Sequence, residues 1–554
     1  MTNFGAKILN NAISALKAQQ AVIATAGNNI ANVNTPGYSR RVAHLETQVG
    51  SESTGAINVG NGVRVSGVRR VADAFLERLL RSALSEKGAS ETENQFLQRI
   101  ENLFNLTGER NTIGSALSGF FSALNDLSVN PSSIELRTNV IERAEDLISS
   151  IKETWNTLAA LQTEADQRLA TEIQTVNSLT SQIADLNGRI RIREAGGVEA
   201  SDERDQRDRL MQQLAEKVGF SAVEVNDGTV TITLSNGFPL VVGESARSLE
   251  VTTSPSFSSG TLPPSLSGQI LSYVVYDYDA GAGSAHIDLT QVLQGQSGTI
   301  GGLLSLRGYA DPADTGALQA NGTIVEVAKR VEALTRALLT DFNQTYLGPD
   351  RDPGTAGHQA SSGDLDGNTP DVFGLFDFDY NGVKDVDGDF YPTGADLNAL
   401  LASGAVDNFS SLLKVSFSDP RRFAAARDVS GGPPAAPIFA PGDASNITNP
   451  NNGLLRLQNT QLALSAGSFS LTATPEEGYN QLVGYVGNLK SASDINVAIQ
   501  SDNFNTASNR RDEVSAVSLD EEFSSLIMYQ KAYQASARMI RLADELLQQV
   551  VQLL

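Results

Sequence analysis

The chain has 554 residues, a length that suggests about three or four domains, and 40% of them are apolar, which is enough to build packed cores. Acidic residues outnumber basic ones by 64 to 41, so the formal net charge is −23. This balance argues against nucleic acids and anionic membrane surfaces as partners, since both require concentrated positive charge. The absence of cysteine excludes disulfides, thiolate metal sites and cysteine nucleophiles.

Neither a targeting segment nor a membrane span is expected from the pattern of apolar residues. The first seven residues contain no long apolar run, so we expect no cleaved secretory signal. No stretch of about 20 apolar residues occurs, so we expect no transmembrane helix.

The first predicted element is a helix over residues 9–33, in which apolar side chains recur at steps of three and four, with Gln19 as the one polar break. We expect it to end near residues 32–34, because asparagine tolerates the left-handed conformation of a helix C-cap. Pro36 and Gly37 then favour a type II turn, since proline presets φ and glycine accepts a positive φ. The apolar positions are Leu9, Ala12, Leu16, Ile23, Ala26, Ile30 and Val33.

Short strands are predicted between residues 40 and 70, and helices dominate residues 72–220. The longest helix should cover roughly residues 133–192, which corresponds to about 80–90 Å at ~1.5 Å per residue. Trp155 lies on its apolar stripe and is interpreted as a core residue. Gly196 and Gly197 should end this helix.

The pattern changes to strands and turns after a shorter helix near residues 202–217. Hairpins are predicted between residues 223 and 242, where Asn-Asp-Gly and Ser-Asn-Gly separate apolar runs. A further strand is expected at 271–276, and helices at about 316–347 and from 476 to the end. Residues 350–450 are rich in Asp, Gly, Pro and Asn and are interpreted as a peripheral, mostly β domain.

This order suggests a chain that runs outward and returns, so that its two ends become neighbours. The predicted fold class is multidomain α+β, with paired N- and C-terminal coiled-coil-like helices, a long-helix bundle and outer, mostly β domains. The predicted domains are a discontinuous terminal core of residues 1–70 with 515–554, a helix-rich domain of 71–349 with 451–514 that contains a β subregion near 219–300, and an outer β-rich insert of 350–450.

The closing helix is predicted to begin after Ser518, because Ser518 and Glu521 have the spacing of a capping box. Its apolar stripe continues to the last residue and would be exposed unless something covers it. We therefore expect the two end helices to pack on each other and on neighbouring subunits. The stripe consists of Leu519, Phe523, Leu526, Tyr533, Ala537, Ile540, Leu547, Val551 and Leu554.

Two motifs at the ends resemble the rod, hook and hook-associated proteins of the bacterial flagellum. Residues 28–38 read NNIANVNTPGY, and this run is similar to the N-terminal signature of that family. Residues 518–522 read SLDEE and residues 529–538 read YQKAYQASAR, which is similar to its closing helix. The continuation Ser39-Arg40-Arg41 and the long helical middle resemble the members at the hook–filament junction.

The resemblance implies a structural role and no enzymatic activity. Members form a ring of like subunits at the hook–filament junction, with the end helices in the inner core of a tube and the β domains outside, and filament assembly requires this ring. The implied partners are other copies of the chain, hook protein on the proximal side, a second hook-associated junction protein on the distal side and an export chaperone on the C-terminal helix. Neither nucleic acid nor membrane is an expected partner. The implied location is the extracellular flagellum, reached through the flagellar type III channel.

The predicted assembly interface combines the apolar stripes of the two end helices with the turn that follows the first helix. It comprises Leu9, Leu16, Ile23, Ile30, Asn32, Thr35, Pro36, Gly37, Tyr38, Leu519, Phe523, Leu526, Tyr533, Ala537, Ile540, Leu547, Val551 and Leu554. The basic pairs Arg40-Arg41 and Arg69-Arg70 are interpreted as solvated residues or as partners in salt bridges between subunits.

One segment has the spacing of half a calcium loop. Asp377, Asp379, Asn381 and Asp385 occupy positions one, three, five and nine, but position twelve is glycine instead of a bidentate glutamate. The alternative is an ordinary surface loop rich in Asp, Asn and Gly. The three histidines are far apart in sequence, and no phosphate loop or dinucleotide fingerprint occurs, so we expect no cofactor.

Three other function classes remain open. A hook subunit or a distal rod protein would share the end motifs. A secreted hydrolase or adhesin could use such ends only for export and anchoring. A cytosolic coiled-coil scaffold would leave the Thr-Pro-Gly-Tyr motif unexplained.

Overall fold

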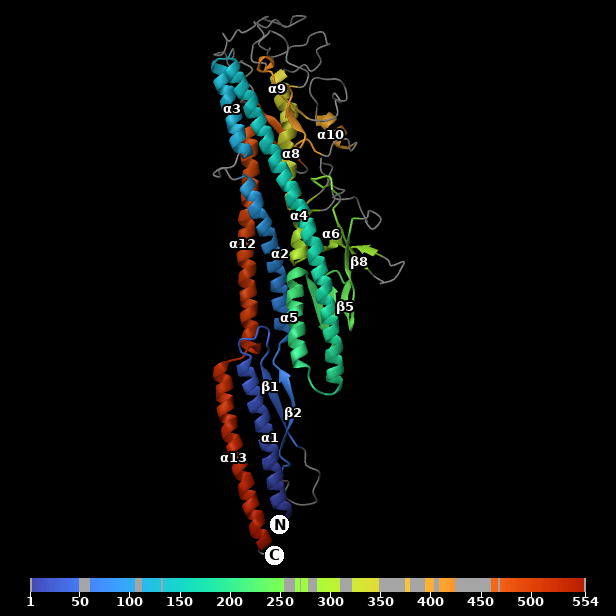
Figure 1. Cartoon of the computed structure of the whole chain (residues 1–554), viewed down its shortest axis with the longest axis vertical. Helices are drawn as coiled ribbons and strands as arrows, with labels where there is room; N and C mark the ends of the chain where they lie inside the picture. The colour runs from blue at the N-terminus through green and yellow to red at the C-terminus, as the bar shows by residue number, and fades with distance from the viewer. Residues whose placement is uncertain are drawn as a thin grey trace.

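Long helices run through most of this computed structural model, which has an elongated shape with both chain termini at one end (Figure 1). The structure describes residues 2–48, 60–104, 112–130, 133–253, 265–269, 271–277, 286–308, 321–347, 374–378, 394–402, 408–423, 460–466 and 469–552.

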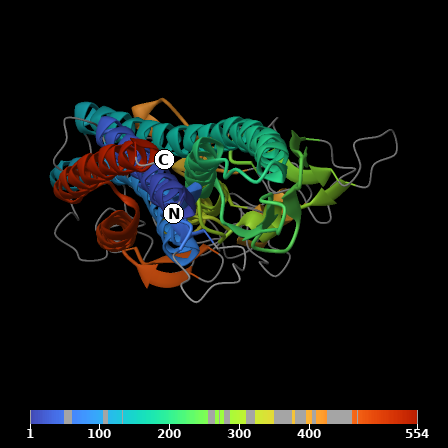
Figure 2. The same ribbon diagram turned by 90° about the horizontal axis from the view of Figure 1, so that it is seen from below.

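The terminal unit pairs the first and last helices. Helix α1 (Thr2–Ala31) runs toward the rest of the molecule and α13 (Leu519–Gln552) returns beside it, as two views show (Figures 1 and 2). Strands β1 (Arg41–Thr47) and β2 (Val63–Arg70) form an antiparallel ladder that packs on α1. The sequence predicted both helices and their proximity.

The helical body contains the longest element of the chain. Helix α4 (Ile134–Ala195) has 62 residues, or about 93 Å at ~1.5 Å per residue. Its first turn is capped by Ser133 Oγ, which accepts from the amide of Leu136, and it ends at Gly196, followed by Gly197 with φ 78°. Helices α2 (Ala74–Phe104), α3 (Ile113–Val129) and α5 (Ser201–Lys217) pack on α4, and α12 (Pro475–Ser515) packs on α2. The bounds predicted for the helices at 133–192 and 202–217 are confirmed to within three residues, while the helix predicted at 9–33 begins earlier, at Thr2.

Two small antiparallel sheets lie against one side of α4 (Figure 1). The four-stranded sheet occupies the predicted hairpin region, and the three-stranded sheet comes after it in the sequence. Gly228 (φ 82°) and Gly237 (φ 92°) adopt the positive φ that the two hairpin turns require. The four-stranded sheet has the order β3-β4-β5-β6, and the three-stranded sheet has the order β7-β8-β9. Their strands are β3 (Phe220–Glu224), β4 (Val230–Leu234), β5 (Pro239–Val242), β6 (Ser245–Ala246), β7 (Leu249–Thr252), β8 (Tyr273–Asp277) and β9 (His286–Asp288).

The elements around residues 323–347 complete the end of the body that lies away from the chain termini (Figure 1). Helix α8 (Thr323–Ala337) continues through a π-helical segment, η2 (Leu338–Phe342), into α9 (Asn343–Leu347). Together they correspond to the helix predicted at about 316–347. Of the predicted outer domain, the described residues form strands β10 and β11, helix α10 and a 3-10 turn. The other elements are α6 (Thr290–Leu293), α7 (Thr299–Arg307), β10 (Phe376–Phe378), α10 (Gly394–Ala402), β11 (Leu413–Val415), η3 (Pro420–Arg422), β12 (Leu462–Ala466) and β13 (Phe469–Ala473).

One continuous apolar core extends along α4. Trp155 is 1% exposed within it, and its indole Nε1 donates to the carbonyl of Leu266 at 3.2 Å, which confirms its interpretation as a core residue. The core joins α2, α3, α7, α8 and α12 to the central helix.

Buried asparagines attach strands to the long helices. Asn187 on α4 donates through Nδ2 to the carbonyls of Val230 (2.9 Å) and Gly243 (2.7 Å) and accepts from the amide of Val230 (3.1 Å). Asn343 satisfies the backbone of Leu375 and Phe376 in the same way. A side-chain amide suits this position because it offers both a donor and an acceptor to the backbone of a strand.

The variant Asn187→Ala should destabilise the body, because it leaves several buried backbone groups without a partner. We expect the free energy of unfolding to fall by about 2–3 kcal/mol. The measurement is urea unfolding followed by the fluorescence of Trp155, the single tryptophan of the chain. The matched control, Asn503→Ala on the exposed face of α12, should leave the midpoint unchanged. Equal midpoints for both variants would contradict the proposed role of Asn187.

Candidate functional site

The face of α13 that packs on α1 follows a heptad pattern. One series of its buried or half-buried positions alternates at steps of four and three, as in a coiled coil. The series is Glu522, Leu526, Tyr529, Tyr533, Ser536, Ile540 and Ala543, and Ser525, Ala532 and Ala537 are half-buried beside it. The sequence prediction contained Leu526, Tyr533 and Ile540 but missed the polar or small members, because a search for apolar residues passes over them.

Small side chains line the buried side of α1. Ala12, Ala18 and Ala26 are buried, and alanine lets neighbouring backbones approach closely. The larger predicted residues Leu9, Leu16, Ile23 and Ile30 are only half-buried. Part of their apolar surface therefore remains available beyond the pair.

Helix α13 also has apolar side chains that the pair does not cover. Phe523 is 50% and Ile527 is 53% exposed, and Leu519 precedes them at the same four-residue spacing. The predicted residue Ala537 is half-buried, while the side chains of Leu547 and Val551 and all of Leu554 lie outside the described residues. Other large exposed apolar side chains of the two end helices, missed by the sequence analysis, are Ile13, Met528, Met539, Leu542 and Leu546.

The segment after α1 forms the predicted type II turn. The amide of Tyr38 donates to the carbonyl of Thr35 at 3.2 Å, and Gly37 has φ 74°. Asn32 closes the helix, since its amide donates to Asn28 O at 3.1 Å, and Thr35 and Pro36 are exposed. A Cβ at Gly37 would collide with the side chain of Arg209 on α5, so the turn lies directly on the body.

Asn29 holds this turn in place and was absent from the predicted site. Its side chain is 1% exposed, and its Oδ1 accepts from Tyr38 OH (2.9 Å) and from the amide of Arg41 (3.0 Å). Its Nδ2 donates to the carbonyl of Arg41 at 2.9 Å. Burial raises the pKa of Tyr38, only partly offset by Arg41, so the phenol keeps the proton that it donates.

Arginines connect the turn and hairpin to the helices around them. The prediction that Arg40, Arg41 and Arg70 are solvated is wrong, because each forms ion pairs within the chain. Their pairing between subunits stays a prediction. Arg40 pairs with Glu521 (2.9 Å) and Glu522 (2.7 Å) at the start of α13, and its amide donates to Ser515 O at 2.8 Å.

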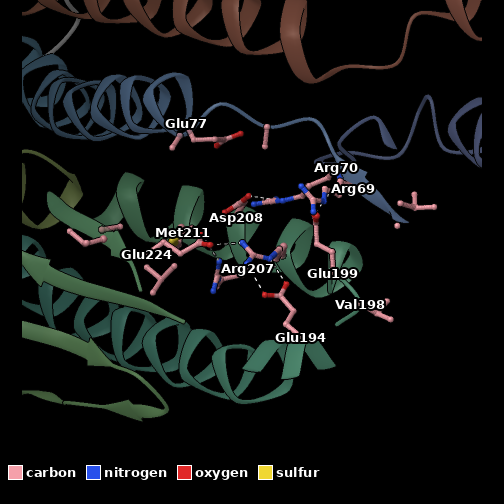
Figure 3. A pocket seen from close by; sticks show the side chains of 18 of the residues that line it. Arg69, Arg70, Glu77, Glu194, Val198, Glu199, Arg207, Asp208, Met211 and Glu224 are labelled. Carbon is pink, nitrogen blue, oxygen red and sulfur yellow. Dashed lines mark hydrogen bonds and ion pairs between the residues drawn. The ribbon is translucent and has the colours of Figure 1, made fainter. Parts of the chain in front are cut away.

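Asp205 is the centre of a second set of contacts. It pairs with Arg70 on β2 at 3.2 Å and with Arg41 on β1 at 3.6 Å, and Oδ2 accepts from the amide of Ser39 at 3.4 Å. Arg70 also pairs with Asp208 on α5, as Figure 3 shows. Burial raises the pKa of Asp205, against the lowering effect of Arg70, so this carboxylate depends on its cationic partners to remain charged.

We call these contacts between the terminal unit and the body the joint. It comprises Ser39, Arg40, Arg41, Arg70, Asp202, Asp205, Asp208, Ser515, Glu521 and Glu522. Among the described residues, the apolar core of the body includes no residue of α1 or α13. The joint is therefore held by charge and hydrogen bonds across its described contacts, with little help from apolar packing.

The calcium prediction is largely untested. Asp377 lies in β10, where its Oδ2 is 3.5 Å from Nζ of Lys414, while Asp379, Asn381 and Asp385 lie outside the described residues. The described residues contain no group of three His, Cys, Asp or Glu side chains that could hold a metal ion. They also contain no helix long and apolar enough to cross a membrane.

The variant Asp205→Ala should open the joint, because it removes a buried carboxylate that three groups share. We expect hydrogen exchange of the Ser39 and Arg40 amides to accelerate roughly 30-fold, equivalent to about 2 kcal/mol. The matched control is Asp202→Ala, which removes an exposed partner of Arg41, and such surface pairs contribute about 0–1 kcal/mol. Unchanged exchange in the Asp205 variant would show that other contacts hold the joint.

Family models of flagellar proteins match both the ends and the middle of the chain. The model of the flagellar hook-associated protein FlgK helical domain matches residues 97–359. Residues 9–38 match the flagella basal body rod protein model, and residues 509–553 match the C-terminal model of flagellar basal body rod FlgEFG proteins.

Full-length relatives carry the same description. Flagellar hook-associated protein 1 of Salmonella typhimurium is 28% identical over 97% of this chain and 98% of its own length. The protein of that name from Bacillus subtilis is 26% identical over 98% of this chain and 97% of its own. The flagellar hook junction protein FlgK from Burkholderia pseudomallei has a similar fold, with a TM-score of 0.55 and 16% identity over 79% of this chain and 100% of that one. Over nearly its whole length, the chain is thus similar to proteins described as flagellar hook-associated protein 1.

Proposed function

We propose that this chain is a structural subunit of the hook–filament junction, where it forms a ring on which the flagellar filament is assembled. The observation that carries this function is the paired terminal helices, which leave apolar side chains uncovered on both helices. A face of this kind is typical of a surface that another protein covers. The relatives' common description supports the location of that surface in the flagellar axis.

The exposure of apolar side chains on α1 and α13 refines the predicted interface. The half-buried Leu9, Leu16, Ile23 and Ile30 recur every seven residues on α1, so together they present one continuous stripe to a neighbouring helix. On α13, Phe523 and Ile527 serve the same purpose near the joint. Thr35, Pro36, Gly37 and Tyr38 have a different role in this proposal, because the turn that they form orients α1 against the body.

The proposed domain arrangement follows from the same division. Residues 1–70 with 515–554 form the inner core, residues 71–349 with 451–514 surround it, and residues 350–450 face outward. The antiparallel return of α13 beside α1 supports the first of these units. The partners proposed for the ring are like subunits, hook protein on one side and a second junction protein on the other.

Export through the flagellar channel, with a chaperone on α13, completes the proposal. The uncovered apolar side chains of α13 support the chaperone, because they would otherwise promote premature association. The alternative of a hook or distal rod protein is disfavoured by the helical body, whose residues match the FlgK helical domain. The relatives are structural proteins, and the proposal involves no catalytic step.

The double variant Phe523→Ser with Ile527→Ser should fold normally but fail to support filaments, because both side chains lie outside the buried core and present exposed apolar surface. We expect unchanged circular dichroism of the purified chain and at least a tenfold loss of filamented cells by electron microscopy. The control is Gln530→Ser with Gln534→Ser, two exposed polar positions on the same helix, which should retain filaments. Normal filaments in the Phe523/Ile527 variant would contradict the interface.

Deletion of the gene in its own host tests the junction role itself. We expect cells with hooks but without filaments, and filament protein released into the medium, because the filament would have no base on which to polymerise. Electron microscopy of the cells and an assay of the medium provide the measurement. Cells without hooks would favour the rod or hook alternative instead.

A further inference from the structure

A cavity of about 750 Å³ lies beside the joint, between β2, α2, the end of α4 and α5 (Figure 3). Its walls carry six arginines and five carboxylates. None of the functions proposed above requires this cavity. Its size is within the range of about 300–1,000 Å³ that is typical of ligand sites.

The carboxylates of the cavity already have cationic or hydrogen-bonding partners. Glu77 accepts from Arg511 at 3.1 Å, Glu194 accepts from Arg204 at 2.6 Å, and Asp208 pairs with Arg70. Glu224 pairs with Arg204 at 2.8 Å, and Glu199 accepts from the amide of Arg70 at 3.2 Å. These acidic groups are therefore occupied within the chain.

Three arginines of the cavity are different. The side chains of Arg69 on β2 and of Arg78 and Arg81 on α2 form no hydrogen bond or ion pair with any residue that the structure describes. Arg69 and Arg78 are exposed, and Arg81 is half-buried. Burial is the largest cause that lowers the pKa of Arg81, and Arg78 lowers it too, against the raising effects of Asp208 and Glu77. A guanidinium remains charged under physiological conditions, so this side chain is desolvated without full compensation.

A fourth arginine adds positive charge behind them. Arg207 is fully buried, with Nη1 donating to Asn187 Oδ1 (2.9 Å) and Gly228 O (2.7 Å). Its Nη2 lies 3.3 Å from Glu224 Oε2, while its Nε has no acceptor among the described residues. The unpaired positive charge of the cavity therefore comes from Arg69, Arg78 and Arg81, and the cavity has room for a ligand.

We propose that this cavity binds an oxyanion, a carboxylate or a phosphate, through Arg69, Arg78 and Arg81. Guanidinium groups suit this ligand because they can donate two parallel hydrogen bonds to either anion. The anion would connect β2 of the terminal unit to α2 of the body and so stabilise the joint. Its source is either an acidic side chain of another polypeptide or a free phosphate.

The experiment titrates the full-length chain with a hexaglutamate peptide and, separately, with inorganic phosphate. Isothermal calorimetry is run at constant ionic strength, because salt alone screens the ion pairs of the joint. We expect binding of at least one probe and at least tenfold weaker binding in Arg81→Gln. Stronger binding of the peptide would identify a polypeptide as the source, and stronger binding of phosphate would identify a free anion.

Two variants distinguish a site from a folding effect. Arg78→Gln lies on the exposed rim and should weaken binding while circular dichroism stays unchanged. Arg143→Gln removes an arginine of α4 that pairs with Asp146 on an exposed surface, and it should bind as the unaltered chain does. The proposal is overturned if neither probe binds the unaltered chain. It is also overturned if Arg81→Gln and Arg78→Gln bind as well as the control Arg143→Gln.

Discussion

The pairing of Asp205 with Arg41 and Arg70 is the interaction on which the arrangement of the molecule depends. These arginines begin and end the hairpin that follows α1, while Asp205 lies on α5 of the body. One ion pair alone would not fix the orientation of the terminal unit relative to the body. Here one carboxylate satisfies two guanidinium groups and a backbone amide, and Arg40 repeats the arrangement at the start of α13.

The body is organised differently, by apolar burial along one helix. Helix α4 is long enough to contact the small sheets, α3, α5, α7 and α8 in succession. Asparagines supply the directional contacts that apolar packing lacks, since Asn187 and Asn343 each bind a strand at a fixed position. The chain thus combines a rigid, apolar body with a terminal unit attached through polar groups.

Local pattern was sufficient to predict the helices, the Pro36-Gly37 turn and the glycines that end α4, because each depends on neighbouring residues. The joint could not be predicted, because Arg40 and Glu522 are distant in sequence and either one alone is typical of a solvated side chain. Asn29 was missed for a similar reason: nothing local shows that an asparagine in a helix will bind the backbone of a turn. For α13, the apolar stripe was recognisable, but its division into covered and uncovered faces required the position of α1.

The pairing of α1 with α13 also sets an order of events. The two helices occupy residues 2–31 and 519–552, so their contact closes a loop that contains nearly the whole chain. The terminal unit cannot form until residues 519–552 reach the first helix. Formation of the surface that joins the chain to its neighbours is in this way tied to a contact between residues very distant in sequence.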